Sequence, residues 1–120
     1  MLNDDDYTDV VIQVQAKHPA LTQFGFGGSG DIRPEAVKLC VEWLLKHDAF
    51  DRRKTINEHT SSYSWKHIVE RYYDSYIAEG EFICAALYLG YKMKKRNTAS
   101  GRISPNAWFN IREYDKTSSK

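Results

Sequence analysis

The first apolar pattern along the chain has helical spacing and covers residues 5–17. Its apolar side chains recur three or four positions apart, which places them on one face of a helix. The members of this stripe are Tyr7, Val10, Val11 and Val14. Aspartates at the start complement the positive end of the helix dipole. The β-branched run over residues 10–12 also suits a strand, so the pattern leaves helix and strand open.

Residues 19–30 are rich in glycine and separate this element from the next. A glycine-rich loop before a helix can bind phosphate, but the spacing here is not GxGxxG and no GKS or GKT follows. We therefore expect the four glycines of this stretch to permit tight turns. Phe24 and Phe26 are expected to anchor the loop to the core, and the role of residues 25–30 in function stays open.

A second helix is predicted from Pro34 onwards, because proline suits the first helical turn. Its apolar face consists of Val37, Cys40, Val41, Leu44 and Leu45. A basic cluster follows the helix and is formed by Arg52, Arg53 and Lys54. Positive charge beyond the end of a helix is favourable for the helix dipole. The same cluster also suits contact with nucleic acid or another anionic partner, so both interpretations stand.

Residues 61–90 have the pattern of two helices joined by a short turn. Ser61 or Ser62 is a suitable N-cap for the first of them. Its long apolar stripe consists of Trp65, Ile68, Val69, Tyr72, Tyr76 and Ile77. On this pattern Gly80 breaks the helix, a further helix follows, and Gly90 is the residue after its end.

After this block the apolar period changes from helical to alternating. Residues 91–94 alternate between apolar and basic side chains, which is typical of a strand. Residues 97–101 have the composition of a turn. Together these features predict a β-hairpin over residues 91–111.

The expected fold class is therefore mostly α with a small β-hairpin (α+β). It has a four-helix core, and its helix-turn-helix-like block precedes the C-terminal hairpin. We expect one domain over residues 1–115, since domains typically run to about 100–150 residues. Residues 116–120 are expected to be a frayed tail.

A helix, a short turn, a second helix and a basic hairpin is also the order of a winged helix-turn-helix, whose second helix enters the major groove. Here that helix, residues 81–89, contains no Arg, Lys, Asn, Gln, Ser or Thr. Those side chains make most contacts with bases and phosphates. A helix that is apolar nearly all round belongs to a core. We therefore expect residues 61–90 to be a scaffold rather than a groove-reading unit.

Charge is nearly balanced over the chain, at +1, but it is uneven along it. The acidic residues near the start are Asp4, Asp5, Asp6 and Asp9. The basic residues of the predicted hairpin are Lys92, Lys94, Lys95, Arg96 and Arg102. Three interpretations of the hairpin stand: it contacts phosphates, it faces an acidic protein, or its lysines merely guard an edge strand. The acidic segment is either a partner-facing surface or a solvated one.

No set of residues specifies a reaction. His67 and Glu70 lie one helical turn apart and come nearest to an acid–base pair. There is no HExxH or CxxC spacing, and Cys40 and Cys84 each lie in an apolar run, as buried thiols do. We therefore expect no enzyme, no metal and no cofactor. The acidic start and the lack of a long apolar run favour a cytoplasmic protein that does not enter a membrane.

A block of the chain resembles small accessory proteins of bacterial phages and plasmids. The residues that carry this resemblance are Ser62-Tyr63, Lys66-His67, Glu70-Arg71, Tyr76-Ile77, Gly80, Phe82-Ile83, Ala85-Ala86, Gly90 and residues 104–111. The resemblance covers about half of the chain, residues 60–111, and carries over no catalytic or binding residue. It implies a context in which small proteins bind and redirect host machinery. Anti-defence inhibitors of the anti-CRISPR type and small DNA-binding regulators both belong to that context.

The expected function is a non-catalytic binding protein of mobile-element origin that engages a host protein or nucleoprotein complex. The alternative is a regulator that contacts DNA or RNA through the basic hairpin. A small metal-dependent hydrolase ranks third. The sequence identifies neither the partner nor the oligomeric state.

Overall fold

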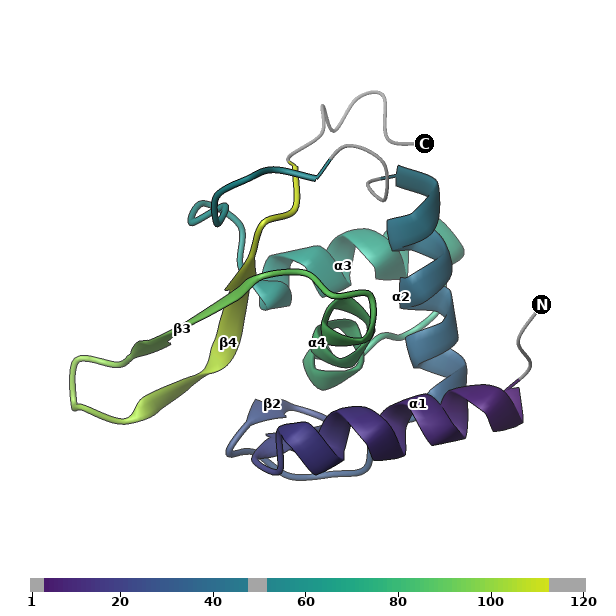
Figure 1. The fold of residues 1–120 in the computed structure, drawn as a ribbon, viewed down its shortest axis with the longest axis horizontal. Coiled ribbons are helices and arrows are strands. Elements are labelled where there is room, and N and C mark those ends of the chain that lie inside the picture. Colours follow the sequence, from purple (N-terminus) through teal and green to yellow (C-terminus); the bar gives the residue numbers. More distant parts are fainter. Residues whose placement is uncertain (1–3, 48–51, 113–120) are drawn as a thin grey trace.

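A computed structural model describes residues 4–47 and 52–112 of the chain (Figure 1). In chain order its elements are α1 (Asp4–Lys17), β1 (Leu21–Thr22), β2 (Gly25–Phe26), α2 (Pro34–His47), α3 (Ser62–Tyr73), α4 (Glu79–Tyr88), β3 (Met93–Asn97) and β4 (Ile103–Phe109). The strands form two antiparallel pairs, β1 with β2 and β3 with β4. The predicted class, mostly α with a small C-terminal β-hairpin, is confirmed.

Helix α4 is the centre of the molecule. It contacts α1, α2 and α3, and Figure 1 shows it between them, with the β3–β4 hairpin projecting to one side. Every residue from Glu79 to Ala86 is buried. The largest aromatic side chains of the core are Trp43, Trp65, Phe82 and Phe109. The prediction that this helix is part of the core is confirmed, because its side chains are enclosed by the other elements.

The first element is a helix rather than a strand, which settles the alternative that the sequence left open. The predicted stripe of Tyr7, Val10, Val11 and Val14 is buried, and α1 contacts α2 and α4. Ile12, the one branched apolar residue off this stripe, is exposed. Helical packing of the stripe therefore outweighs the β propensity of the Val-Val-Ile run.

The break between α3 and α4 lies before the position that the sequence predicted. Helix α3 ends at Tyr73, and Asp74 has a φ of 52°, in the left-handed region. Gly80 does not break a helix but lies in the first turn of α4, where its N–H donates to Gln23 O at 2.8 Å. A Cβ atom on Gly80 would lie 1.7 Å from Thr22 O. This glycine serves the close approach of the β1–β2 loop to the helix.

Several side chains depart from the predicted apolar faces. Leu45, predicted on the apolar face of α2, is 48% exposed. Trp43 is buried instead, and the centre of its ring lies 5.8 Å from that of Trp65. Tyr76, predicted for the stripe of the third helix, lies in the loop beyond α3 and is 52% exposed. Of the two phenylalanines in the glycine-rich loop, Phe26 is buried and Phe24 is exposed. That loop contains the β1–β2 pair, which the sequence did not predict.

A buried ion pair connects the residue before α2 to the first turn of α4. The fully buried carboxylate of Glu81 accepts hydrogen bonds from Arg33 Nε at 2.9 Å, Arg33 Nη2 at 2.8 Å and Arg33 N–H at 2.8 Å. It also accepts from Ala78 N–H at 2.8 Å, which caps its own helix. We call Gln23, Arg33, Gly80 and Glu81 the α4 joint. A buried charge with four donors is well compensated, so this joint fixes the loop on the core.

Candidate functional site: the basic hairpin face

Two basic segments that are far apart in the sequence lie side by side in the structure. Residues 52–58 run along the end of β4 and are held by backbone hydrogen bonds. Arg53 N–H donates to Asn110 O at 3.2 Å, and Asn57 N–H donates to Phe109 O at 2.8 Å. Asn110 makes a second hydrogen bond with Arg53, because its Nδ2 donates to Arg53 O at 2.8 Å. The basic cluster after α2 is therefore joined to the hairpin.

Lys92 completes this connection. Its Nζ donates to Lys54 O at 3.2 Å, and its backbone N–H donates to Asn110 Oδ1 at 2.8 Å. We use the name hairpin face for the basic side chains gathered here and the half-buried indole among them. The hairpin face consists of Arg52, Arg53, Lys54, Lys92, Lys94, Arg96 and Trp108.

The alternation of the β3 strand divides the basic residues of the hairpin between its two sides. Lys94 is paired with Trp108 in the register, and Arg96 Cζ lies 4.2 Å from the centre of the Trp108 ring. Cross-strand partners share one side of a sheet, so these three side chains belong together. Lys95 points to the other side, where its Nζ lies 4.3 Å from the centre of the Phe26 ring. The predicted five-residue basic patch is therefore split.

Arg52 has a positioning contact as well as a charge. Its Nη2 donates to Leu89 O at 2.7 Å, at the C-terminal end of α4, where a positive charge is favourable. Its guanidinium also lies 3.8 Å from the centre of the Tyr91 ring. The charges of this cluster were expected to lie at the end of the second helix, whereas Arg52 lies at the end of α4.

One acidic residue lies within the hairpin face. Glu58 Oε1 accepts from Lys94 Nζ at 3.1 Å and from Arg96 Nη2 at 2.6 Å. These side chains are 50%, 46% and 38% exposed, in that order. The hydrogen bonds from Lys94 and Arg96 lower the pKa of Glu58. Glu58 could not be identified from the sequence, because nothing along the chain relates it to a strand 36 residues away.

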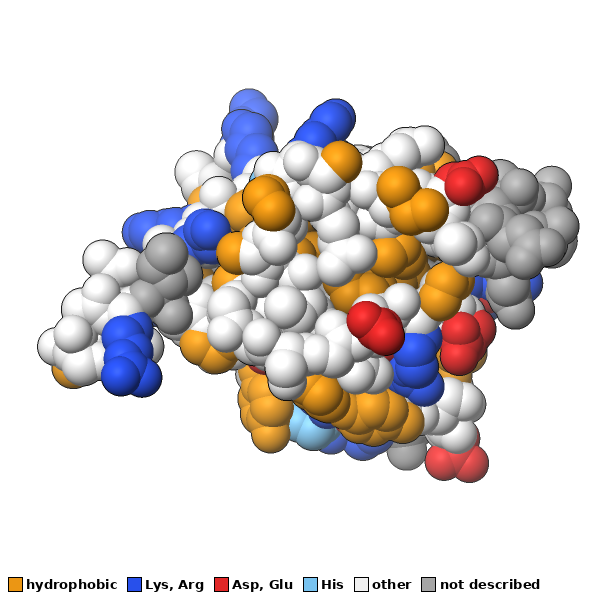
Figure 2. Space-filling model, turned by 90° about the horizontal axis from the view of Figure 1, so that it is seen from below, with side chains coloured by type: hydrophobic (Ala, Val, Ile, Leu, Met, Phe, Trp, Pro, Cys, Tyr) orange, Lys and Arg blue, Asp and Glu red, His pale blue; other side chains and the backbone are white. Residues whose placement is uncertain are grey.

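The other predicted site residues lie outside the hairpin face. Arg102 is exposed next to the turn of the hairpin, and Asp9 is exposed on α1. The side chains of Asp4, Asp5 and Asp6 lie outside the described part of the chain. In the view of Figure 2 the basic side chains lie mainly toward the hairpin, and the acidic ones mainly toward the opposite side. Because the side chains of Asp4, Asp5 and Asp6 are not described, the predicted separation between the acidic segment and the basic hairpin stays a prediction.

The His67–Glu70 pair forms but also has a structural task. His67 Nδ1 and Glu70 Oε1 are 2.8 Å apart, and Lys66 Nζ lies 3.4 Å from Glu70 Oε1. Glu70 Oε2 accepts from Ile77 N–H at 3.1 Å, which fastens the loop after α3. Burial favours the neutral acid, but the hydrogen bond from Ile77 and the charge of Lys66 outweigh it and lower the pKa of Glu70. Lys66 is buried as well.

A second buried carboxylate joins α3, α4 and β4. Ser62 Oγ donates to Glu79 Oε2 at 2.6 Å and accepts from Ala107 N–H at 2.9 Å. With its amide nitrogen turned to the carboxylate, Asn106 donates to Glu79 Oε1 at 3.0 Å. Burial raises the pKa of Glu79. The hydroxyl of Ser62 is engaged on both sides, so this cluster serves packing of the scaffold.

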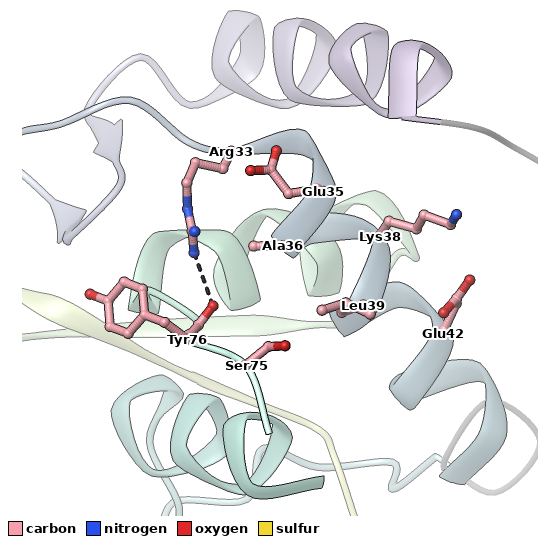
Figure 3. Close-up of a pocket in the computed structure, with 8 residues that line it drawn as sticks. All are labelled: Arg33, Glu35, Ala36, Lys38, Leu39, Glu42, Ser75 and Tyr76. Carbon is pink, nitrogen blue, oxygen red and sulfur yellow. Dashed lines mark hydrogen bonds between the residues drawn. The ribbon is translucent and has the colours of Figure 1, made fainter. Parts of the chain in front are cut away.

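A groove of about 480 Å³ lies between α2 and the loop after α3, and it is open to solvent (Figure 3). Arg33 reaches across it, and its Nη2 donates to Tyr76 O at 3.0 Å. Lys38 and Glu42 point outward along α2. The Arg33 guanidinium is also bound by Glu81, so this side chain of the groove is part of the α4 joint.

Comparison with protein families, with characterised proteins and with solved structures gives no significant match. Among the described residues, no helix is long and apolar enough to cross a membrane. Within residues 4–47 and 52–112, no three His, Cys, Asp or Glu side chains form a group that could hold a metal ion. Both cysteines are free thiols and buried, as their apolar surroundings predict.

Proposed function

We propose that this chain is a non-catalytic binding protein and that its hairpin face engages an anionic macromolecule, foremost the nucleic acid of a host nucleoprotein complex. The observation that carries the proposal is that residues 52–54 are joined to the side of the hairpin that presents Lys92, Lys94 and Arg96. There Arg96 lies over the half-buried indole of Trp108, and Lys94 is the cross-strand partner of that indole. Among the described residues, the Glu58 carboxylate accepts hydrogen bonds from both of these cations. Lys and Arg neutralise phosphates, and aromatic rings beside them stack on bases.

The scaffold supports contact with the nucleic-acid backbone rather than reading of sequence. Sequence-specific contact needs side chains that reach the edges of bases in a groove. Helix α4, which occupies the place of a recognition helix in chain order, is buried over residues 79–86. The hairpin face offers Lys and Arg instead, which contact phosphates without regard to sequence.

The proposed context is a bacterial mobile element, and it rests on the resemblance of residues 60–111 to phage and plasmid accessory proteins. In that context a small protein without catalytic equipment acts by occupying a surface of the host machinery. An inhibitor of anti-defence type fits this description. A regulator that binds free DNA or RNA through the same face is the second candidate, because the basic side chains would serve either partner.

The test compares two charge-reversed variants with equal net charge. In the first, Lys94→Glu and Arg96→Glu reverse the hairpin face. In the second, Lys38→Glu and Arg71→Glu reverse charges on α2 and α3. We expect the wild type and the control to bind oligonucleotides at low salt, and the hairpin-face variant to bind about tenfold more weakly or not at all.

Capture from a bacterial lysate, with and without nuclease, separates the two candidates. Recovery of a stoichiometric protein complex that nuclease releases supports the nucleoprotein proposal. Recovery of nucleic acid alone supports the free-nucleic-acid regulator. If the wild type recovers no partner and binds no oligonucleotide at low salt, the proposed function is wrong.

A further inference from the structure

We propose that Lys94 and Arg96 form a phosphate subsite and that Glu58 occupies this subsite in the free protein as a built-in competitor. The inference rests on the proposed function and deepens it. It assigns the position of one bound phosphate and a mechanism that limits affinity. In this proposal a nucleic-acid phosphate displaces the Glu58 carboxylate.

The geometry around Glu58 is that of an occupied anion site. Two cations from one side of β3 donate to a single oxygen, Oε1, at 3.1 and 2.6 Å. Carboxylate and phosphate oxygens accept from the same Lys and Arg donors, and charge-assisted bonds to both have similar lengths. The position that Glu58 fills is therefore one that a phosphate oxygen would fill with the same two donors.

The donors are prepared for a replacement anion. Arg96 lies over the Trp108 ring, 4.2 Å from its centre, and this contact does not depend on Glu58. Because the indole keeps the guanidinium in place, little side-chain freedom is lost when a phosphate arrives. Lys94 is opposite Trp108 in the strand register, so its starting position is also set by the sheet.

The carboxylate can leave while its backbone stays. The neighbouring Asn57 is fully buried, and its Nδ2 donates to Ile111 O at 3.1 Å. Asn57 Oδ1 accepts from His59 N–H at 3.0 Å, so residues on both sides of Glu58 are fixed. The Glu58 side chain itself is half exposed. Ion pairs between exposed side chains are weak, so a phosphate backbone that brings many charges can displace this one.

The experiment measures the affinity of Glu58→Gln for a thymidine oligonucleotide of about 20 residues, because single strands expose phosphates and bases together. We expect this variant to bind about fivefold more tightly than the wild type. We also expect the slope of log affinity against log salt to be steeper by up to about 0.7, the value for one phosphate contact on a single strand. The reason is that the wild type breaks the Glu58 ion pair to make this contact, whereas the variant has no such pair to break. Glu42→Gln removes one negative charge from α2 and is expected to stay within about twofold of the wild type.

A double-mutant cycle separates local competition from a general gain of positive charge. If Glu58 occupies the subsite, Arg96→Gln costs more affinity in the Glu58→Gln background than in the wild type. If Glu58 acts only through its distant field, the two effects are additive and the proposed subsite is wrong. Melting curves of all variants confirm that each is folded.

The remaining outcomes distinguish this inference from the proposed function. If the wild type binds the oligonucleotide and Glu58→Gln binds no more tightly, the competitor is refuted and the binding function stands. If neither protein binds it at low salt, both fail for nucleic acid. Polyglutamate of equal charge is the second probe. If Glu58→Gln gains as much affinity over the wild type for polyglutamate as it does for the oligonucleotide, the phosphate assignment is overturned in favour of an acidic protein partner.

Discussion

The α4 joint and the hairpin face each hold a glutamate between basic donors, and the difference between them lies in exposure to water. Glu81 is completely buried and accepts from Arg33 and from a backbone N–H of its own helix. Glu58 is half exposed, and its donors among the described residues are the side chains of Lys94 and Arg96 on β3. At a buried carboxylate water cannot replace the protein donors if they are lost, whereas at an exposed carboxylate it can. The first contact is therefore part of the fold, and the second is available for exchange.

Arg33→Ala is expected to have the largest effect, because it leaves the Glu81 carboxylate buried without its cation. Loss of one partner of such a pair destabilises a protein by about 3 kcal/mol or more. Urea unfolding measures this loss. The matched change at the hairpin face is Arg96→Ala, which removes one of the two cations that donate to Glu58. Equal losses from the two variants would contradict the distinction between the two glutamates.

Gly80→Ala is expected to have the next largest effect and to lower the free energy of unfolding by about 2 kcal/mol. Its added methyl group would lie 1.7 Å from Thr22 O, so either the β1–β2 loop or α4 must move. Thermal unfolding measures the change. Gly101→Ala is the control, because a Cβ atom there meets no neighbour within 4 Å and only its φ of 84° opposes the substitution. A more stable Gly80→Ala variant would show that the loop does not need this close contact.

Glu79→Gln is expected to change how stability depends on pH. Burial raises the pKa of Glu79, so the folded protein holds this proton more firmly than the unfolded chain does. The contribution of Glu79 is therefore most favourable at low pH and is lost as pH rises from the ordinary glutamate pKa through the raised one. Melting temperatures over this window should fall less steeply, or rise more steeply, with pH in Glu79→Gln than in the wild type. Parallel curves for the two proteins would contradict a titrating Glu79.

The smallest expected effect is a change in tryptophan fluorescence when the hairpin face is occupied. Trp43 and Trp65 are buried, whereas Trp108 is half buried beside Arg96. A base or phosphate on this face should alter the emission of Trp108 alone. Titration of the wild type with an oligonucleotide measures the change, and Trp108→Phe should abolish it. A signal that persists in Trp108→Phe would place the ligand elsewhere.

Local pattern was enough to predict most of the fold. Helical spacing placed the stripe of α1 on its buried face, and the alternation after Gly90 predicted the hairpin. Gly80 was misassigned because a glycine that ends a helix and one that admits a neighbouring backbone look alike in sequence. The difference depends on Thr22 and Gln23, which only the tertiary structure brings to α4.

The hairpin face was predictable only in part. The basic residues were identified from their charge, and the same period of two that predicted the strand also implies that Lys94 and Lys95 point to opposite sides. The adjacency of residues 52–54 and the hairpin depends on the asparagine contacts of Asn57 and Asn110. Contacts of this kind span more than fifty residues and leave no periodic signal.

The bond between Gly80 and Gln23 also bears on the order in which the chain acquires its shape. On the ribosome, Gln23 emerges long before Gly80, and translation proceeds at about 5–20 residues per second. The N-terminal third therefore spends several seconds without the helix that covers its apolar side chains. Closure of so long a loop costs entropy before any contact repays it. During synthesis the Gly80–Gln23 bond can therefore form only after α4 has emerged, and the β3–β4 hairpin follows it.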